Sequence, residues 1–244
     1  MAGNSFTSMI GLLEKMAQHR KANPTTKSEE LYYASMAKYF VNIQQAKEEG
    51  KLIVGHTVML PLEIFYAMDI VPMHLECSAS MMTILLNKYD EYLGTARSYG
   101  LAPETCSGHR ILTASFLLDE LPRPDFVVWS NQVCDNTAKS GDALMDIYGI
   151  PGFYLDRPYR YSKQDMTYMV KELENFIRFL EEQTGKKMDY DKLKETVRLS
   201  QKVIDLYREI YTLRKNRPAP MRNRVLMNQM LMEMFFAGSS AGVE

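Results

Sequence analysis

The sequence predicts a doubly wound α/β fold, with a parallel sheet placed between N-terminal helices and a long C-terminal helical hairpin. Two patterns support this prediction. Short apolar runs alternate with helical segments between residues 51 and 160, and the flanking segments show helical spacing without such runs. The 244 residues, 46% apolar and 24% charged, are ordinary for a globular chain. We therefore expect a helical lead-in over 1–50, an α/β domain over 51–160, and a hairpin with an exit helix over 161–244.

The lead-in is predicted as two helices. Its first apolar stripe, at helical spacing, is formed by Met9, Leu12, Leu13 and Met16. Asn23 and Pro24 end that helix, because proline has no backbone N–H and disfavours helical geometry in the residue before it. Thr26 or Ser28, followed by acidic residues, can cap a second helix that continues through Phe40.

Four short apolar runs are the predicted strands, near 52–55, 71–75, 126–129 and 152–155. The first two flank a helix that begins at Pro61 with the sequence PLEIFYAMDI. Right-handed β-α-β units of this kind place both strands parallel in one sheet. We expect a helix and a loop between Ser80 and Tyr99, a helix that opens at Cys106, and a further helix that closes at Gly149.

The C-terminal region is predicted to be helical. Ser162 and Asp165 form a capping-box pattern at the start of a helix that ends at Gly185. A second helix runs from about Asp191 to Lys215, before a proline-containing stretch. We expect these two helices to pair beside the sheet, followed by the apolar segment RVLMNQMLMEMFFAG.

Charge and hydropathy bear on partners and compartment. The formal net charge of −1 supplies no basic field, so we expect no nucleic-acid partner and no anionic membrane surface. No stretch reaches the roughly 18 apolar residues of a membrane span, and a cytoplasmic protein is expected. In a reducing compartment, three cysteines are better interpreted as thiols or ligands than as disulfides.

Two of the cysteines fall at equivalent corners of the predicted fold. Cys106 opens a helix, and Cys134 follows the strand Phe126–Trp129. Both thiols then lie at the mouth of the sheet where ligands bind, and helix N-termini there favour thiolate. A shared metal ion or cluster is one interpretation, and a pair of small buried apolar residues is the other. A zinc site that adds Cys77 and His109 is a further alternative, without compact spacing in its favour.

Four sequence pieces, in this order and spacing, resemble one known family. They are Gly55-x5-Pro61-x-Glu63 with Ala67 and Pro72; Cys106-Ser107; Asp125-Phe-Val-Val followed by Cys134-Asp135; and Leu155-Asp-Arg-Pro-Tyr159. The later TGKKM, LRKNRP and Pro218-x-Pro220 match the family's helical region as well. The chain resembles the N-terminal half of subunits of the 2-hydroxyacyl-CoA dehydratases and benzoyl-CoA reductases.

This resemblance implies an iron-sulfur enzyme of anaerobic metabolism, a lyase or oxidoreductase that acts on a CoA thioester by one-electron reduction. Cys106 and Cys134 then correspond to two of the three thiolates that hold a 4Fe-4S cluster, which makes 51–160 a cluster-binding domain. Glu63 corresponds to an acidic residue that the family keeps beside the cluster, and we take it as a catalytic candidate; its alternative role is to offset the helix dipole. The implied partners are a homologous second subunit, in a heterodimer, and a separate ATP-hydrolysing iron-sulfur activator.

Several nearby residues have simpler interpretations. His56 can transfer protons near neutral pH, and His109 lies one helical turn from Cys106, but packing roles are favoured for both. Asp135 is favoured as a first-turn carboxylate, and Cys77 as a structural residue.

The chain departs from the family pattern in two ways. Asp69 stands where the family has glycine at a turn, and the second α/β domain expected after the hairpin is absent from the sequence. A fragment, one piece of a split subunit and a degenerate paralogue all fit this. A non-catalytic assembly subunit without a cluster therefore stays open beside the enzyme, and the sequence does not choose between hydroxyacyl and aromatic substrates.

Overall fold

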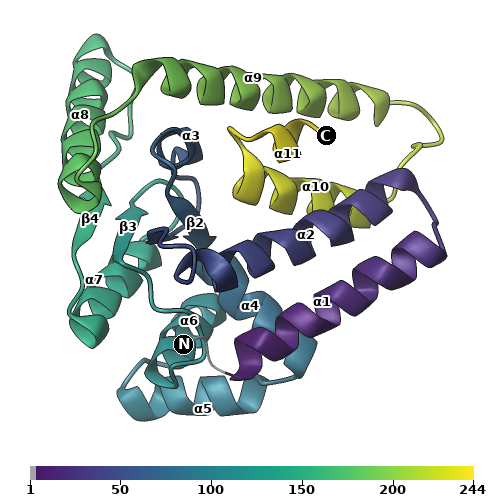
Figure 1. Cartoon of the computed structure of the whole chain (residues 1–244), viewed down its shortest axis with the longest axis horizontal. Helices are drawn as coiled ribbons and strands as arrows, with labels where there is room; N and C mark the ends of the chain where they lie inside the picture. The colour runs from purple at the N-terminus through teal and green to yellow at the C-terminus, as the bar shows by residue number, and fades with distance from the viewer. Residues whose placement is uncertain (1–3) are drawn as a thin grey trace.

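The computed structural model describes residues 4–244, and it begins with two packed helices (Figure 1). These are α1 (Asn4–Ala22) and α2 (Lys27–Ala46), as predicted for the lead-in. Thr26 caps α2, because its hydroxyl accepts a hydrogen bond from the Glu29 backbone N–H at 3.2 Å. Phe6 on α1 and Phe40 on α2 are buried and meet edge to face, which joins the pair to the main core.

The sheet has four strands, all parallel, in the order β2-β1-β3-β4. They are β1 (Ile53–His56), β2 (Val71–His74), β3 (Phe126–Ser130) and β4 (Gly152–Leu155). The predicted α/β class and all four predicted strands are therefore confirmed, with ends that differ by one residue at most.

Side chains along β3 alternate between two hydrophobic clusters, so both faces of the sheet are covered. Val127 and Trp129 face the cluster formed with α1, α2 and the helices from α4 to α7. Phe126 and Val128 face a second cluster formed with α3 and α8. The bounds of these helices are α3 Leu62–Ala67, α4 Leu75–Leu86, α5 Tyr89–Tyr99, α6 Ser107–Leu117, α7 Asn136–Tyr148 and α8 Lys163–Thr184. Trp129 packs so closely on α7 that a Cβ at Gly141 would overlap its ring.

Three local predictions differ from the structure. The helix after Pro61 has only six residues, and Asp69, in the turn that follows it, adopts a left-handed conformation with φ 57°. Aspartate tolerates this region better than most residues, so it can stand where glycine would be usual. β2 passes directly into α4 at His74, and the segment predicted as one helix and a loop contains two helices separated at Asn87.

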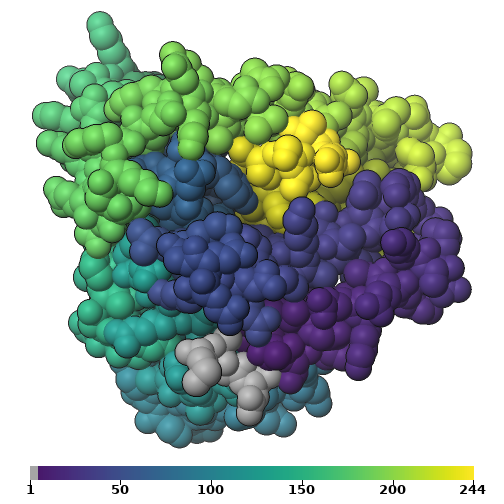
Figure 2. Space-filling view, viewed as in Figure 1, coloured from purple at the N-terminus to yellow at the C-terminus, as the bar shows by residue number. Residues whose placement is uncertain are grey.

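The C-terminal region contains the long helices α8 and α9 (Tyr190–Leu213), followed by α10 (Asn223–Phe236) and the short α11 (Ser240–Val243). The predicted capping box is present, since Ser162 and Asp165 bond each other's backbone N–H groups. The two long helices diverge instead of pairing side by side: α9 crosses the top of the view and packs on α3 and α11 (Figure 1). The C-terminal residues fill the space between α9 and α2 (Figure 2). No helix in residues 4–244 has the length and apolar character needed to cross a bilayer.

Candidate active site at the carboxyl edge of the sheet

The strand order creates a ligand-binding position between β1 and β3. The chain moves from β1 outward to β2, and then returns to the other side of β1 to form β3. In parallel α/β sheets, the loops that leave two such strands separate and open a crevice at their carboxyl ends. Here those loops are residues 57–61 after β1 and residues 131–135 after β3.

Cys106 lies at the start of α6, whose N-terminus points to this same edge of the sheet. It is exposed and precedes the first helical residue, and its carbonyl accepts the Arg110 backbone N–H at 3.1 Å. No side chain of residues 4–244 caps α6, so the partial positive charge of its free N–H groups is available to an anion such as a thiolate.

Cys134 is held in the loop after β3 by a histidine from α6. Its Sγ lies 3.7 Å from His109 Nε2, and His109 Nδ1 lies 2.7 Å from Ser140 Oγ on α7. The Thr137 hydroxyl donates to the Cys134 carbonyl at 2.7 Å, which fixes the loop to the first turn of α7. Burial lowers the pKa of His109, so the ring is neutral and acts as a hydrogen-bonding bridge between α6 and α7. The sequence favours a packing role for His109, and in the structure this residue also links Cys134 to Ser140.

A cavity of about 430 Å³ lies at the carboxyl edge, beside the loop that carries Cys134. Its walls come from the β1 loop, the first turn of α3, the end of β4, and helices α8, α9 and α10. Glu63, in the first turn of α3, lines it, and so does Gln132, two residues before Cys134. This volume is within the range of small-molecule sites.

Two buried polar atoms on the cavity wall have no partner in the described chain. His56 Nδ1 lies 3.0 Å from the Thr57 carbonyl and donates to it, which leaves Nε2 as a free acceptor. Ser200 Oγ on α9 is the second such atom. Burial lowers the pKa of His56 to about 4, so the ring is uncharged near neutral pH. Buried polar groups normally find partners, so these two atoms are the candidate polar contacts of the cavity wall.

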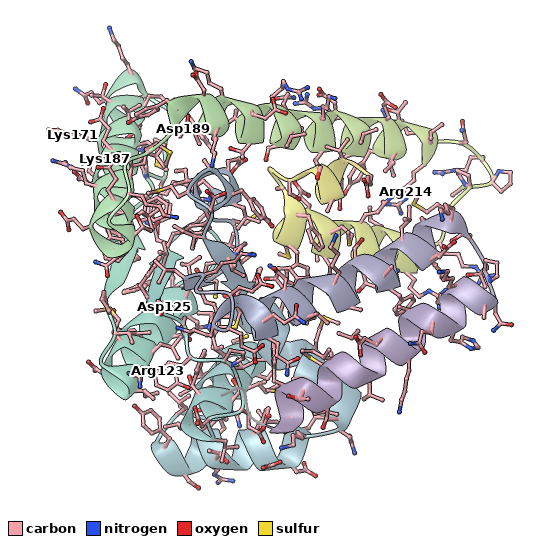
Figure 3. The ribbon with its side chains drawn as sticks, viewed as in Figure 1. Arg123, Asp125, Lys171, Lys187, Asp189 and Arg214 are labelled. Atoms are coloured by element: carbon pink, nitrogen blue, oxygen red, sulfur yellow. The ribbon has the colours of Figure 1, made fainter. Side chains whose placement is uncertain are left out.

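The opposite, amino edge of the sheet has a larger cavity, of about 650 Å³, but its principal charged groups are paired. Asp125 Oδ2 accepts the Ile53 backbone N–H at 2.7 Å, and Asp125 Oδ1 lies 2.5 Å from Lys47 Nζ. Arg123 donates to the Tyr148 carbonyl. Figure 3 shows Arg123 and Asp125 on the side of the molecule away from α9, which bounds the carboxyl-edge cavity. Unpaired polar atoms, and not volume, distinguish the carboxyl-edge cavity from this amino-edge cavity.

The structure places Glu63, Cys106 and Cys134 at this edge, each beyond a strand or at the start of a helix. Asp135 lies at the start of α7 but its side chain makes no capping hydrogen bond. In residues 4–244, no three His, Cys, Asp or Glu side chains gather as a metal-binding group. The alternative zinc site, in which Cys77 and His109 join Cys106 and Cys134, is therefore not formed. Burial raises the pKa of the Cys77 thiol to about 12, which disfavours a thiolate there.

Sequence reasoning missed two cavity residues, Ser200 and Glu233. Ser200 lies in the amphipathic helix α9, and Glu233 is the only acid in the apolar segment that forms α10. A single acidic residue within an apolar segment is a sequence feature that could have identified Glu233 as a candidate site residue. Nothing in the local sequence distinguishes Ser200 in this way.

Comparison with known proteins agrees with the resemblance. Residues 57–244 match the family described as 2-hydroxyglutaryl-CoA dehydratase, D-component. The chain belongs to this dehydratase family. The matched region includes Glu63, Cys106 and Cys134, and it continues through α11.

Curated relatives in this dehydratase family are alpha subunits. The chain is 24% identical to the (R)-phenyllactyl-CoA dehydratase alpha subunit of Clostridium sporogenes, over 82% of this chain and 51% of the relative. It is 25% identical to the (R)-2-hydroxyisocaproyl-CoA dehydratase alpha subunit of Clostridioides difficile, over 68% and 42%. Identity to subunit alpha of (R)-2-hydroxyglutaryl-CoA dehydratase from Acidaminococcus fermentans is 28%, over 45% and 24%. The chain thus aligns with about half the length, or less, of these relatives.

Proposed function

We propose that this chain is a cluster-holding, substrate-binding component of a 2-hydroxyacyl-CoA dehydratase. The observation that carries the proposal is the pair of thiols at one edge of the sheet, Cys106 at the start of α6 and Cys134 before α7, in a member of this family. The cavity beside the Cys134 loop would receive the acyl part of the thioester. We also propose a homologous second subunit, because the relatives are named as alpha subunits.

The donor set fits an iron-sulfur cluster in part. Thiolates are the usual ligands of such clusters, and helix N-termini stabilise thiolates. When bound, a 4Fe-4S cluster would supply one-electron reduction of the thioester. Cys106 and Cys134 would hold two of its four irons, so the remaining positions need ligands from outside these two residues. His109 would keep the Cys134 sulfur in place through its bond network to Ser140.

Glu63 is the proposed catalytic acid or base of the cavity. It lies half-buried in the first turn of α3, and the Thr196 hydroxyl donates to its backbone carbonyl at 3.0 Å, which anchors that turn to α9. A carboxylate on the wall of a mostly apolar cavity can transfer a proton to or from a bound acyl group. With the second subunit and activator present, we expect Glu63→Gln to lower kcat by roughly 100-fold while iron content is kept.

The cluster assignment is tested by anaerobic reconstitution, with iron and sulfide analysis and the visible charge-transfer band. The chain is measured alone and with a homologous second subunit, as the parent and as Cys106→Ala and Cys134→Ala, with Cys77→Ala as the matched control. We expect both test variants to lose iron, and Cys77→Ala to match the parent. Stoichiometric cluster that survives both test substitutions would refute the assignment, and loss with Cys77→Ala would move a ligand to α4.

A non-catalytic assembly subunit is the second candidate. The observation in its favour is that no three metal-binding side chains gather within residues 4–244. If the chain associates with a second subunit and supports turnover after both Cys106→Ala and Cys134→Ala, this candidate replaces the first.

A further inference from the structure

The carboxyl-edge cavity has an apolar wall built from five separate parts of the chain. Most of its lining residues are aliphatic or methionine: Met59, Leu60, Leu62, Leu155, Met169, Leu173, Val203, Ile204, Met230 and Met234. Methionine side chains are flexible and polarizable, so such a wall adapts to apolar groups of different shape. The cavity therefore offers favourable burial to an aliphatic or aromatic side chain.

The charged groups on this wall are both acidic. Glu63 comes from α3 and Glu233 from α10, while no lysine or arginine is among the lining residues of the described chain. Burial raises the pKa of Glu233 above the usual value, which reduces the ionised fraction of its carboxyl group. A ligand carboxylate inside the cavity would lie beside these two acidic side chains, and no lysine or arginine of residues 4–244 lines the wall to pair with it.

The unpaired polar atoms on the wall are also unsuited to binding a carboxylate at the end of a ligand's acyl group. His56 Nε2 is an acceptor, because Nδ1 donates to the Thr57 carbonyl, and Ser200 supplies a single hydroxyl. One acceptor and one hydroxyl match an uncharged group that both donates and accepts, such as an alcohol. A carboxylate needs several donors to replace its water shell.

We propose that this cavity selects 2-hydroxyacyl groups with an apolar side chain, and that Glu233 on α10 excludes acyl groups that end in a carboxylate. This inference rests on the proposed function, and it assigns Glu233 a role in specificity. The expected substrates are therefore 2-hydroxyacyl-CoA thioesters with an apolar side chain, and thioesters of dicarboxylic acids are expected to be excluded.

Binding of two CoA thioesters to the 244-residue chain tests the proposal by titration calorimetry. The first is 2-hydroxy-4-methylpentanoyl-CoA, whose side chain is branched and aliphatic, and the second is 2-hydroxyglutaryl-CoA, with free CoA as the baseline. We expect the aliphatic thioester to bind roughly 100-fold more tightly than the dicarboxylic one. Glu233→Gln should reduce this ratio by roughly tenfold, because the side chain keeps its shape and loses its charge.

The exposed Glu209→Gln on α9 is the matched control, and it should leave the ratio unchanged. Met230→Lys places a cation on the wall through a side chain of similar length, and it should reverse the preference. Equal binding of both thioesters, or a ratio that neither Glu233→Gln nor Met230→Lys alters, overturns the inference but leaves the proposed function standing. If neither thioester binds more tightly than free CoA, the proposed function fails and the inference fails with it.

Discussion

Two strand-to-helix junctions of this sheet carry a cysteine beside a histidine, at nearly the same distance. At the β3–α7 junction, Cys134 Sγ lies 3.7 Å from His109 Nε2. At the β2–α4 junction, Cys77 Sγ lies 3.8 Å from His74 Nε2. The neighbouring group is therefore the same in both places, and it does not decide which sulfur is available for chemistry.

The connection between strand and helix decides which of the two sulfurs is available for chemistry. β2 passes into α4 without a loop, so His74 itself caps the helix by accepting the Cys77 backbone N–H at 3.4 Å. Glu76, whose carboxylate lies 3.3 Å from His74 Nδ1, is half-buried beside them. Burial raises the pKa of Glu76 to about 7 and lowers that of His74, so the histidine is uncharged near neutral pH and the contact is not an ion pair. The five residues between β3 and α7 instead carry Cys134 to a half-exposed position.

The largest expected difference between the junctions is in thiol reactivity. With a pKa of about 12, the Cys77 thiol is roughly one part in 10,000 thiolate at pH 8. We expect Cys106 and Cys134 to be alkylated by iodoacetamide at least roughly 100-fold faster than Cys77, as measured site by site by mass spectrometry. In urea all three should react alike. Labelling of Cys77 at the rate of Cys134 in the folded chain would remove the distinction.

The next effect concerns stability and pH at the β2–α4 junction. The folded pKa of Glu76 is raised from 4.5 to about 7, so the folded state holds this proton more tightly than the unfolded state. Its contribution is present below pH 4.5 and is lost as the pH rises through 7. Glu76→Gln should therefore raise the free energy of unfolding by about 2 to 3 kcal/mol at pH 8 and hardly at all at pH 4.5.

Urea unfolding at both pH values measures this difference, and the exposed Glu48→Gln is the control for loss of a charge. An equal effect of Glu76→Gln at the two pH values would mean that folding does not raise the pKa of Glu76. A loss of stability at pH 8 would instead indicate that the Glu76 carboxylate forms a favourable charged contact in the folded chain.

The smallest effect tests the bridge at the β3–α7 junction. His109→Phe leaves the buried Ser140 hydroxyl without its partner and should cost about 1 to 2 kcal/mol of unfolding free energy. A double-mutant cycle with Ser140→Ala should show a coupling of about 1 kcal/mol. The same histidine variant should change the alkylation rate of Cys134, while His74→Phe should leave that rate unchanged. Zero coupling would show that His109 does not join α6 to α7.

Local rules in the sequence determined most elements of this protein. The four strands follow from short apolar runs, and the start and end of α8 follow from Ser162, Asp165 and Gly185. These features depend on neighbours within a few residues, so they can be read from the chain directly. The positions of Glu63, Cys106 and Cys134 beyond strands or at helix starts are of the same kind, although their roles in catalysis and cluster binding stay predictions.

Only the tertiary structure decided which side chains meet. The direction of α9 away from α8, the contact of His109 with Cys134 across 25 residues, and the joining of Glu63 with Glu233 around one cavity depend on strand order and helix packing. Residues far apart in the chain meet because burial of both sheet faces fixes where each helix lies, and no short pattern encodes that outcome. Among residues 4–244, the cavity is lined by acidic and not basic side chains, and this character comes from the fold because each contributing segment is ordinary by itself.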